Sequence, residues 1–562
     1  MASMAFIDPK RFTIDDHIDD LNVDGNPMDY MNKSPPDDKF SEFKTLTEDD
    51  VLQLIKSSSN ASCELDPIPT KLLKQCVHAL LPIITAILNL SLSNGQFTEL
   101  WKCALVTPLL KSAKLELIFN SFRPVSNLQY ISKLSERSVA TQFLDHIRER
   151  CPLPINQSSY KKFHSTETAL MKIQSDILMK MDKQQVVLLV LLDLSAAFDT
   201  VDHGILLDLL RLNYGFDGTV LRWFSSYLQD RSMKVKIDNV HSDPVDLVYG
   251  VPQGSCLGPI LFTVYAAPLF DIISKHLPSA HAYADDTQLY MSFHAGDETS
   301  EAHALEALEL CIAEIRKWML TFKLKINDSK TEFIIIGGRQ QKLKVNIDSI
   351  SVGGETIAPS TCVRNLGAMF DDNLLMDKHI SKICKTGHFH LYNIRRIRKF
   401  LSKEATQTLV QASITSHLDY CNALLYGVAG YQIDKLQKLQ NSAARLITFT
   451  SKWSHISPVL IDLHWLKVEF RIKYKILVFV YKSLNELAPG YLCDMINKAN
   501  SYYRTSRLIV PKVKCVTFAG RSFPFAAATE WNNLPKYIKC AESFDSFKLK
   551  LKTHLFRACY NL

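Results

Sequence analysis

The sequence predicts an α+β protein with more than one domain. Its 562 residues exceed the length at which a single hydrophobic core stops growing. Apolar residues recur at helical spacing in 47–100 and 377–500, whereas 186–370 contains several short β-prone runs. Two observations locate a sheet: the continuous apolar run Val186–Leu192, typical of a strand covered on both faces, and the strand–turn–strand pattern of His281–Tyr290.

The composition is that of a globular protein from a reducing compartment. Apolar residues make up 47% and charged residues 22% of the chain. A net charge of +7 is compatible with a polyanionic partner but does not require one. The 13 cysteines follow no zinc-finger or disulfide spacing. With no signal-peptide core at the N-terminus and no apolar run long enough for a membrane span, we expect an intracellular protein, in the nucleus or the cytoplasm, that does not enter a membrane.

The N-terminal part of the chain changes from irregular to helical. Residues 1–45, rich in Asp and Pro, are predicted to be disordered or a linker. Thr47 is followed by acids, a pattern typical of a capped helix, and 47–100 is predicted to be mainly helical. We expect a strand over 101–110 and helices over 128–184.

The remaining elements follow in the same way. A helical stretch, 204–229, precedes short strands and then the segment Gly250–Phe262, whose three glycines and two prolines predict a loop–helix junction where the backbone passes close to a bulky group. A helix is expected over 298–322 and a strand over Val363–Phe370. Residues 501–562 are expected to mix short strands with a final basic helix.

Three acids are candidates for a metal site. Asp285 and Asp286 are adjacent at a predicted turn, where they repel each other unless water or a divalent cation such as Mg²⁺ compensates. Asp193 ends the apolar run, and a carboxylate there is costly unless it faces a site; the alternative is that it caps the next turn.

Two groups of basic residues suggest a phosphate-containing ligand. Lys111 and Arg123 end apolar runs and are either surface charges or cationic contacts to a triphosphate. Tyr160 and Lys161 lie in a stretch where basic and aromatic residues alternate, which suits a nucleic-acid strand.

Taken in order, these segments resemble the reverse transcriptase of non-LTR (LINE-type) retrotransposons, near the chicken-repeat and jockey-like branch. The resemblance covers about residues 47–370 and rests on seven motifs in family order. These are Lys111, Phe122–Val125, Asp193–Asp199, Gly250–Phe262, Tyr283–Asp286, Asn327–Glu332 and Leu366–Gly367.

The resemblance implies a right-hand polymerase with fingers, palm and thumb, followed by a mostly helical C-terminal region. The implied segments are a linker (1–45), an N-terminal extension and fingers (46–185), a palm (186–370, with the reverse transcriptase core at about 91–370), a basic helical thumb or connection (371–500) and a C-terminal region (501–562).

The resemblance also implies an RNA-directed DNA polymerase that extends a DNA primer on an RNA template with dNTPs. Asp193, Asp285 and Asp286 would hold two Mg²⁺ ions, with Mn²⁺ as an alternative. The nucleotide-binding residues would be Lys111, Arg123, Phe198 (excluding a 2′-hydroxyl), Gln253 and Lys330. The template and primer would contact Pro252, Gly254, Tyr160, Lys161, Arg396 and Arg398.

Two further expectations concern what the chain lacks. The segment Gln157–Lys161 departs from the Gln-Ser-Gly-Phe-Arg pattern of many relatives, which weakens the template contact expected there. No stretch looks able to form the endonuclease that such elements usually carry, so we expect endonuclease activity not to be encoded in this chain. The alternative function is a catalytically silent, nucleic-acid-binding descendant of the same fold; a lost acid would favour it, but all three acids are present.

Overall fold

The structure is a computed structural model that describes residues 25–32, 34–112, 115–118, 121–195, 197–498 and 507–562. The chain forms two units, each built from segments distant in sequence. Unit 1 comprises Met1–Tyr160, Asp193–Lys275 and Cys311–Asn327. Unit 2 comprises Lys161–Leu192, His276–Leu310 and Asp328–Leu562.

Unit 1 combines a mixed sheet with helices from both ends of its sequence range. The sheet has the order β2-β1-β5-β6, and β7 also pairs with β5. Its strands are β1 (Cys103–Leu110), β2 (Phe122–Asn127), β5 (Arg231–Ile237), β6 (Val240–His241) and β7 (Val245–Leu247), with β4 (Leu194–Ser195) and β10 (Lys325–Ile326) paired separately. Its helices include α2 (Glu48–Ser57), α3 (Thr70–Gln75), α4 (Val77–Asn94), α5 (Tyr130–Arg150), α7 (His203–Leu212), α8 (Gly218–Leu228), α9 (Gly258–Tyr265) and most of α10 (Leu269–His276).

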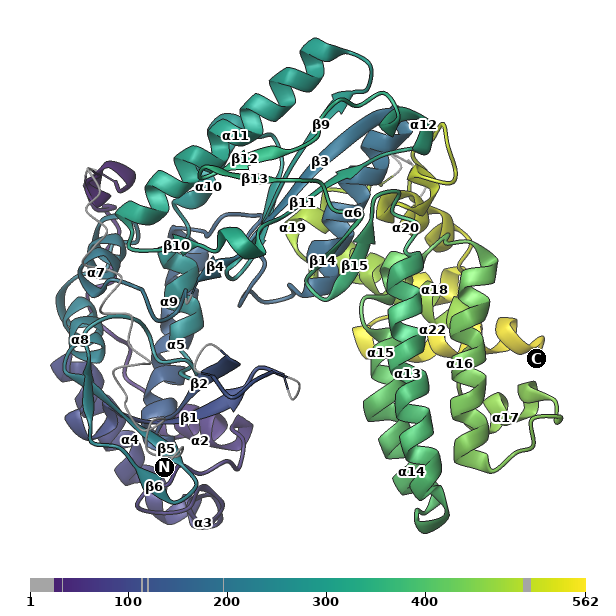
Figure 1. The fold of residues 1–562 in the computed structure, drawn as a ribbon. Helices are drawn as coiled ribbons and strands as arrows, with labels where there is room; N and C mark the ends of the chain where they lie inside the picture. Colours follow the sequence, from purple (N-terminus) through teal and green to yellow (C-terminus); the bar gives the residue numbers. More distant parts are fainter. Residues whose placement is uncertain (1–24, 33, 113–114, 119–120, 196, 499–506) are drawn as a thin grey trace. The chain divides into compact units, whose positions relative to one another are not determined.

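Unit 2 is organised around an antiparallel sheet of order β11-β3-β9-β8. These strands are β11 (Glu332–Ile336), β3 (Gln185–Leu192), β9 (Asp286–His294) and β8 (Ala280–Tyr283). Helix α6 (Thr166–Asp182) packs against β3 (Figure 1). Because β3 is paired on both edges and covered, six of its eight residues are buried, as its continuous apolar sequence predicts.

The rest of unit 2 is mainly helical. Helices α13 and α16 lie side by side (Figure 1). Two hairpins come before the helices: β12–β13 (Ile350–Val352, Glu355–Ile357) and β14–β15 (Cys362–Asn365, Ala368–Asp371). The main helices are α13 (Asp377–Ile397), α14 (Lys403–Val410), α15 (Ser416–Asp419), α16 (Gly430–Thr448), α17 (Ile456–Asp462), α18 (Val468–Leu484), α19 (Gly490–Cys493), α20 (Phe523–Asn532), α21 (Lys536–Lys539) and α22 (Phe544–Tyr560). Helix α11 (Glu298–Thr321) begins in unit 2 and ends in unit 1.

Two expected strand assignments are wrong. The single strand expected over Val363–Phe370 is a hairpin in which Val363 pairs with Phe370. Leu366 and Gly367 form its turn with φ of 42° and 89°, a left-handed pair that reverses the chain in two residues. The short strands expected near the C-terminus are also wrong for the described residues 507–562, where the regular elements are helical and Leu508 makes an isolated bridge.

One helix in the described part of the chain, α4, is long and apolar enough to cross a membrane by length and composition alone. This is weak evidence, because a core helix of a soluble protein passes the same test. One side of α4, including Leu81, Leu88 and Leu92, is buried, and the helix packs against α2 and α8.

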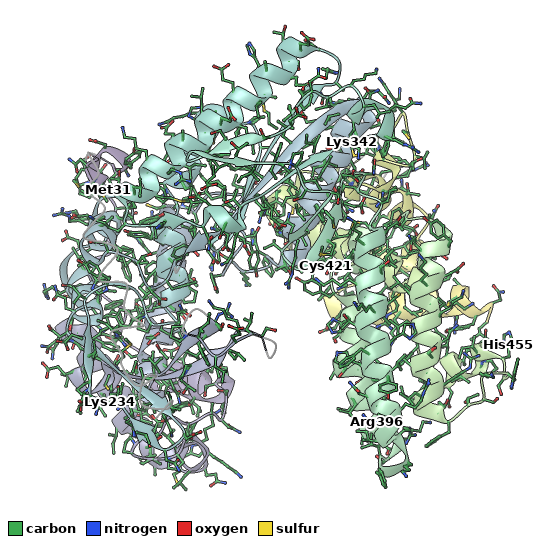
Figure 2. All side chains as sticks on the ribbon, in the orientation of Figure 1. Met31, Lys234, Lys342, Arg396, Cys421 and His455 are labelled. Atoms are coloured by element: carbon green, nitrogen blue, oxygen red, sulfur yellow. The ribbon has the colours of Figure 1, made fainter. Side chains whose placement is uncertain are left out.

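Arg398, expected to contact nucleic acid, is an interior residue. Its Nε and Nη2 donate to the carbonyls of Leu446 and Ile447 at 2.8 Å, and its guanidinium lies 3.8 Å from the centre of the Phe449 ring. It therefore satisfies carbonyls at the C-terminus of α16, where the last turn of a helix has no internal donors. Arg396, two residues earlier, is exposed on α13 (Figure 2).

We expect Arg398→Ala to lower the free energy of unfolding by about 3 kcal/mol, because it leaves buried carbonyls without donors. Arg396→Ala is the matched control and should change it by less than about 0.5 kcal/mol. Urea denaturation followed by circular dichroism measures both. Equal stabilities would contradict the capping role.

Candidate active site

The acidic turn predicted from the sequence is the tip of the β8–β9 hairpin in unit 2. Tyr283 pairs with Asp286, so Ala284 and Asp285 form the turn. Ala284 has φ of 58°, a left-handed conformation that costs a non-glycine residue energy and is often found at functional sites. Asp285 is half-buried. Asp286, which was expected in the turn, is exposed and is instead the first residue of β9.

The β3–β9 register places these acids at one end of the unit 2 sheet. Leu192, the last residue of β3, pairs with Thr287, which directly follows Asp286. Asp193 directly follows Leu192 and is the first residue of the next unit 1 segment. There it is half-buried, and its carbonyl accepts a hydrogen bond from the Asn327 amide at 2.9 Å.

Phe198 has a fixed ring in unit 1. The centre of this ring lies 5.0 Å from the centre of the Phe262 ring, and the two ring planes make an angle of 37°. Phe262 is fully buried on α9. The carbonyl of Phe198 accepts a hydrogen bond from the Val251 amide at 2.8 Å. Ring and backbone are therefore both held, and the half-buried side chain presents a rigid flat surface.

The glycine-rich loop passes close to other backbone segments of unit 1, as its sequence predicts. Gly250 has φ of 83°, and a Cβ there would lie 2.8 Å from the Asp199 carbonyl oxygen. Gly254 has φ of 122°, and its Cβ would overlap the Ser126 carbonyl oxygen. Only glycine fits these two corners, so the loop is fixed against the Asp199 segment and against β2.

Gln253, at the tip of this loop, is bonded to a carboxylate. Its Nε2 donates to Asp199 at 3.1 Å (Oδ1) and 2.9 Å (Oδ2), and its carbonyl accepts from the Ser126 amide at 2.7 Å. Burial raises the pKa of Asp199 to about 6, against the opposing effect of the Gln253 hydrogen bond. The sequence reasoning assigned no separate role to Asp199, which stood only as the end of a motif.

Glu136 is a second residue missed by the sequence reasoning. It is fully buried on α5 and accepts hydrogen bonds from the amides of Cys256 (2.5 Å) and Leu257 (3.1 Å), where α9 begins. Burial raises its pKa, with Arg231 as the main opposing charge. A carboxylate at a helix N-terminus is favourably placed, and here it anchors the far end of the glycine-rich loop. No local signal in the sequence indicated this role, because the two amides that Glu136 binds lie 120 and 121 residues further along the chain.

The two candidate triphosphate contacts belong to one hairpin. Leu109 pairs with Arg123 in the β1–β2 register, and Lys111 lies two residues beyond Leu109, so the two cations share a face of the hairpin. Both are exposed. The amide of Lys111 donates to the carbonyl of Ser121 at 2.8 Å.

The other predicted contacts are dispersed over both units. In unit 1, Pro252 is buried and Tyr160 is exposed with φ of 54°. In unit 2, burial lowers the pKa of Lys161 to about 8. Lys330 is exposed in the short helix Asp328–Lys330.

The structure alone does not present a preformed three-ligand metal centre. In the part of the chain that the structure describes, no group of three or more His, Cys, Asp or Glu side chains is arranged to hold a metal ion. Mg²⁺, however, is commonly bound by only one or two carboxylates together with water and substrate phosphates. Asp285 and Asp286, adjacent carboxylates at a hairpin tip, are a donor set of that kind.

Comparison with known proteins points to the same class of protein, a nucleic-acid polymerase, that the candidate site residues suggest. Residues 111–370 match the family described as "Reverse transcriptase (RNA-dependent DNA polymerase)". The "Probable RNA-directed DNA polymerase from transposon BS" of Drosophila melanogaster is 28% identical over 72% of this chain and 45% of its own length. The corresponding X-element protein is 25% identical over 70% of this chain and 43% of its own, and the jockey protein of the same fly is 26% identical over 54% and 32%.

Residues 111–370 thus match a reverse transcriptase domain. The similar proteins come from non-LTR transposons, and this similarity supports a jockey-like LINE reverse transcriptase. The domain match confirms the expected α+β right-hand polymerase fold. The family generally depends on divalent metal ions. The chain spans less than half the length of these curated relatives.

The burial of Asp199 predicts a pH-dependent stability. Its folded pKa of about 6 exceeds the ordinary value of 3.8, so the folded protein binds the proton more tightly and loses stability as pH rises from about 4 to about 6. Asp199→Asn should therefore be more stable than wild type by about 2–3 kcal/mol above pH 7, and by about half of that at pH 5. Urea denaturation at both pH values measures this. An advantage independent of pH would contradict the assignment.

Proposed function

We propose that the chain is an RNA-directed DNA polymerase that extends a DNA primer along an RNA template with dNTPs. One observation carries the proposal: acids stand at the ends of paired strands. Leu192 and Thr287 are register partners, and Asp193 and Asp286 are their direct neighbours in sequence. Asp286 therefore lies at the end of β9 that is paired with the last residue of β3, and Asp193 follows that last residue in the sequence.

Asp193, Asp285 and Asp286 would hold two Mg²⁺ ions, or Mn²⁺ in their place. Bound there, the ions would activate the primer 3′-hydroxyl and stabilise the leaving pyrophosphate. Asp285 and Asp286 fit this role because they are adjacent at the hairpin tip and one of the two acids is exposed. Lys111 and Arg123, on one face of the β1–β2 hairpin, would bind the triphosphate, with Lys330 as a further cation.

The remaining assignments extend the same proposal. Tyr160, Lys161, Pro252 and Gly254 would contact the template and primer, and the segments given above would be fingers, palm and thumb. We also propose that this chain extends a supplied primer but does not itself cut DNA, and that it works in the nucleus or the cytoplasm. No observation favours the catalytically silent alternative, because the acids and the glycine-rich loop are all in place.

We expect Asp285→Asn to abolish primer extension on RNA while leaving template binding within about twofold, because it removes a metal ligand without adding bulk. Glu355→Gln, an exposed acid in the same unit, is the matched control. Extension by purified protein with Mg²⁺ and dNTPs, alongside filter binding, measures both properties. Wild-type extension that survives in Asp285→Asn would overturn the metal site.

The Phe198 ring would lie under the sugar of the incoming nucleotide and exclude a 2′-hydroxyl. Phe198→Ala should therefore raise the rNTP-to-dNTP ratio of kcat/KM by at least about tenfold, since the group that distinguishes ribose from deoxyribose would fit. Single-nucleotide extension with each substrate measures the ratio. If Phe198 were only a packing residue, the variant would lose stability with the ratio unchanged.

A basic and aromatic stripe on α13 replaces the Arg396–Arg398 pair as the proposed duplex contact. Its members are exposed and recur every three or four residues: Lys378, Lys382, Lys385, Phe389, Tyr392 and Arg396. This spacing places them on one helix face, opposite the buried Ile380, Ile383 and Ile394.

We expect Lys385→Glu with Arg396→Glu to weaken template–primer binding and to flatten the slope of log K against log[salt] by about two, since two phosphate contacts are lost. Lys536→Glu with Lys552→Glu, exposed on α21 and α22, is the charge-matched control. Fluorescence anisotropy between about 50 and 200 mM salt, the range where such contacts matter, measures the slopes. Identical slopes would mean that the stripe faces only solvent.

A further inference from the structure

Three aromatic side chains at one end of the helical region of unit 2 are largely exposed to solvent. Phe400, which follows α13, is 77% exposed, and Phe449, at the end of α16, is 70% exposed. Trp453, four residues later, is 85% exposed. Single exposed apolar residues are common, but a group of large exposed rings marks a contact surface. We call these three residues the aromatic tip.

Phe400 and Phe449 are brought together by Arg398. Its guanidinium lies 3.8 Å from the centre of the Phe449 ring and donates at 2.7 Å to the carbonyl of Leu401, the residue after Phe400. Phe449 has φ of 57°, a strained conformation for a bulky residue at a helix end, where glycine is the usual residue. The fold therefore keeps an exposed ring at a position that disfavours it.

Trp453 is held at the same end of α16. Arg445, in the last turn of that helix, donates to the carbonyls of Ser451 at 3.3 Å and Ser454 at 3.0 Å. The amide of Ser454 also donates to the carbonyl of Ser451 at 3.2 Å, which closes the turn around Trp453. A hydrogen-bonded turn therefore presents this ring to solvent.

The aromatic tip is also basic. The Nζ of Lys399 lies 4.8 Å from the centre of the Phe400 ring, and the Nζ of Lys452 lies 4.6 Å from the centre of the Trp453 ring. Both lysines are exposed. Flat rings beside cations match the two chemical parts of an unpaired nucleotide, whose base stacks on a ring and whose phosphate carries a negative charge.

We propose that the aromatic tip binds an unpaired stretch of the RNA template next to the primer duplex. This inference rests on the proposed polymerase function. Lys399 and Phe400 follow Arg396 by three and four residues, so the tip adjoins the end of the basic and aromatic stripe on α13 (Figure 2). The bases of a duplex are stacked inside it, and their flat faces are open to aromatic side chains only where a strand is unpaired. In a primed template that strand is the RNA, because the template extends beyond the primer.

Binding of primed RNA without dNTPs tests the inference. The probes are an RNA–DNA duplex with about eight unpaired RNA nucleotides at each end and the same duplex with blunt ends. We expect Phe400→Ala with Trp453→Ala to weaken binding of the extended duplex at least about tenfold, as for the loss of one or two stacked bases, and to leave binding of the blunt duplex within about twofold. Phe449 stays in place because it packs on Arg398. Urea denaturation checks that the variant is folded.

A leucine pair distinguishes a nucleic acid from a protein partner. Phe400→Leu with Trp453→Leu keeps an apolar surface but removes the flat rings, so it should lose as much affinity for the extended duplex as the alanine pair. Tyr537→Ala with Leu549→Ala, also exposed in unit 2, is the matched control and should bind like wild type.

Three outcomes would each overturn the inference. These are an equal loss of affinity for both duplexes in the alanine pair, no loss for either, and wild-type binding by the leucine pair, which would assign the aromatic tip to a hydrophobic protein contact. A wild-type protein that prefers the extended duplex through these rings but extends no primer would instead overturn the proposed function and support the single-strand contact.

Discussion

The burial of β3 is the constraint on which the rest of unit 2 depends. The strand is paired with β9 and β11 along its length and covered by α6, so its backbone hydrogen bonds are satisfied and its side chains are apolar. A polar residue is tolerated only where this burial ends, which is at Asp193. The register with β9 then brings the acidic β8–β9 turn to the same end of the sheet. Hydrophobic burial thereby determines where the carboxylates emerge, before any electrostatic effect is considered.

In unit 1 the corresponding constraint is close contact between main-chain segments at positions where glycine leaves no room for a side chain. Gly250 and Gly254 allow the loop to lie directly against the Asp199 segment and β2. Hydrogen bonds from Val251 and to Gln253 close this contact. The consequence is that Gln253 lies against the Phe198–Asp199 segment, from which it is distant in sequence, through main-chain contacts as well as through its side-chain hydrogen bonds to Asp199.

The sequence predicted the elements whose patterns are local. The apolar run of β3, the helices of 47–100 and the close approach of the glycine-rich loop were all readable from residue type and spacing. The Leu366–Gly367 turn was missed because the apolar residues around it suggested one continuous strand. Arg398 was misjudged because a run of basic residues does not show which face each occupies; its helical spacing from Leu391 and Ile394, both buried, was the available signal. The bonds of Asp199 and Glu136 are long-range, and no local pattern in a single sequence could show them.

The left-handed backbone of Ala284 has a consequence for precision at the acidic turn. A β-carbon in this conformation costs about 1–2 kcal/mol, yet it narrows the range of conformations open to the hairpin more than glycine would. The backbone next to Asp285 therefore has fewer conformations open to it than a glycine at position 284 would allow. At this turn the fold gives up some stability, and the backbone that carries the two acids is restricted in return.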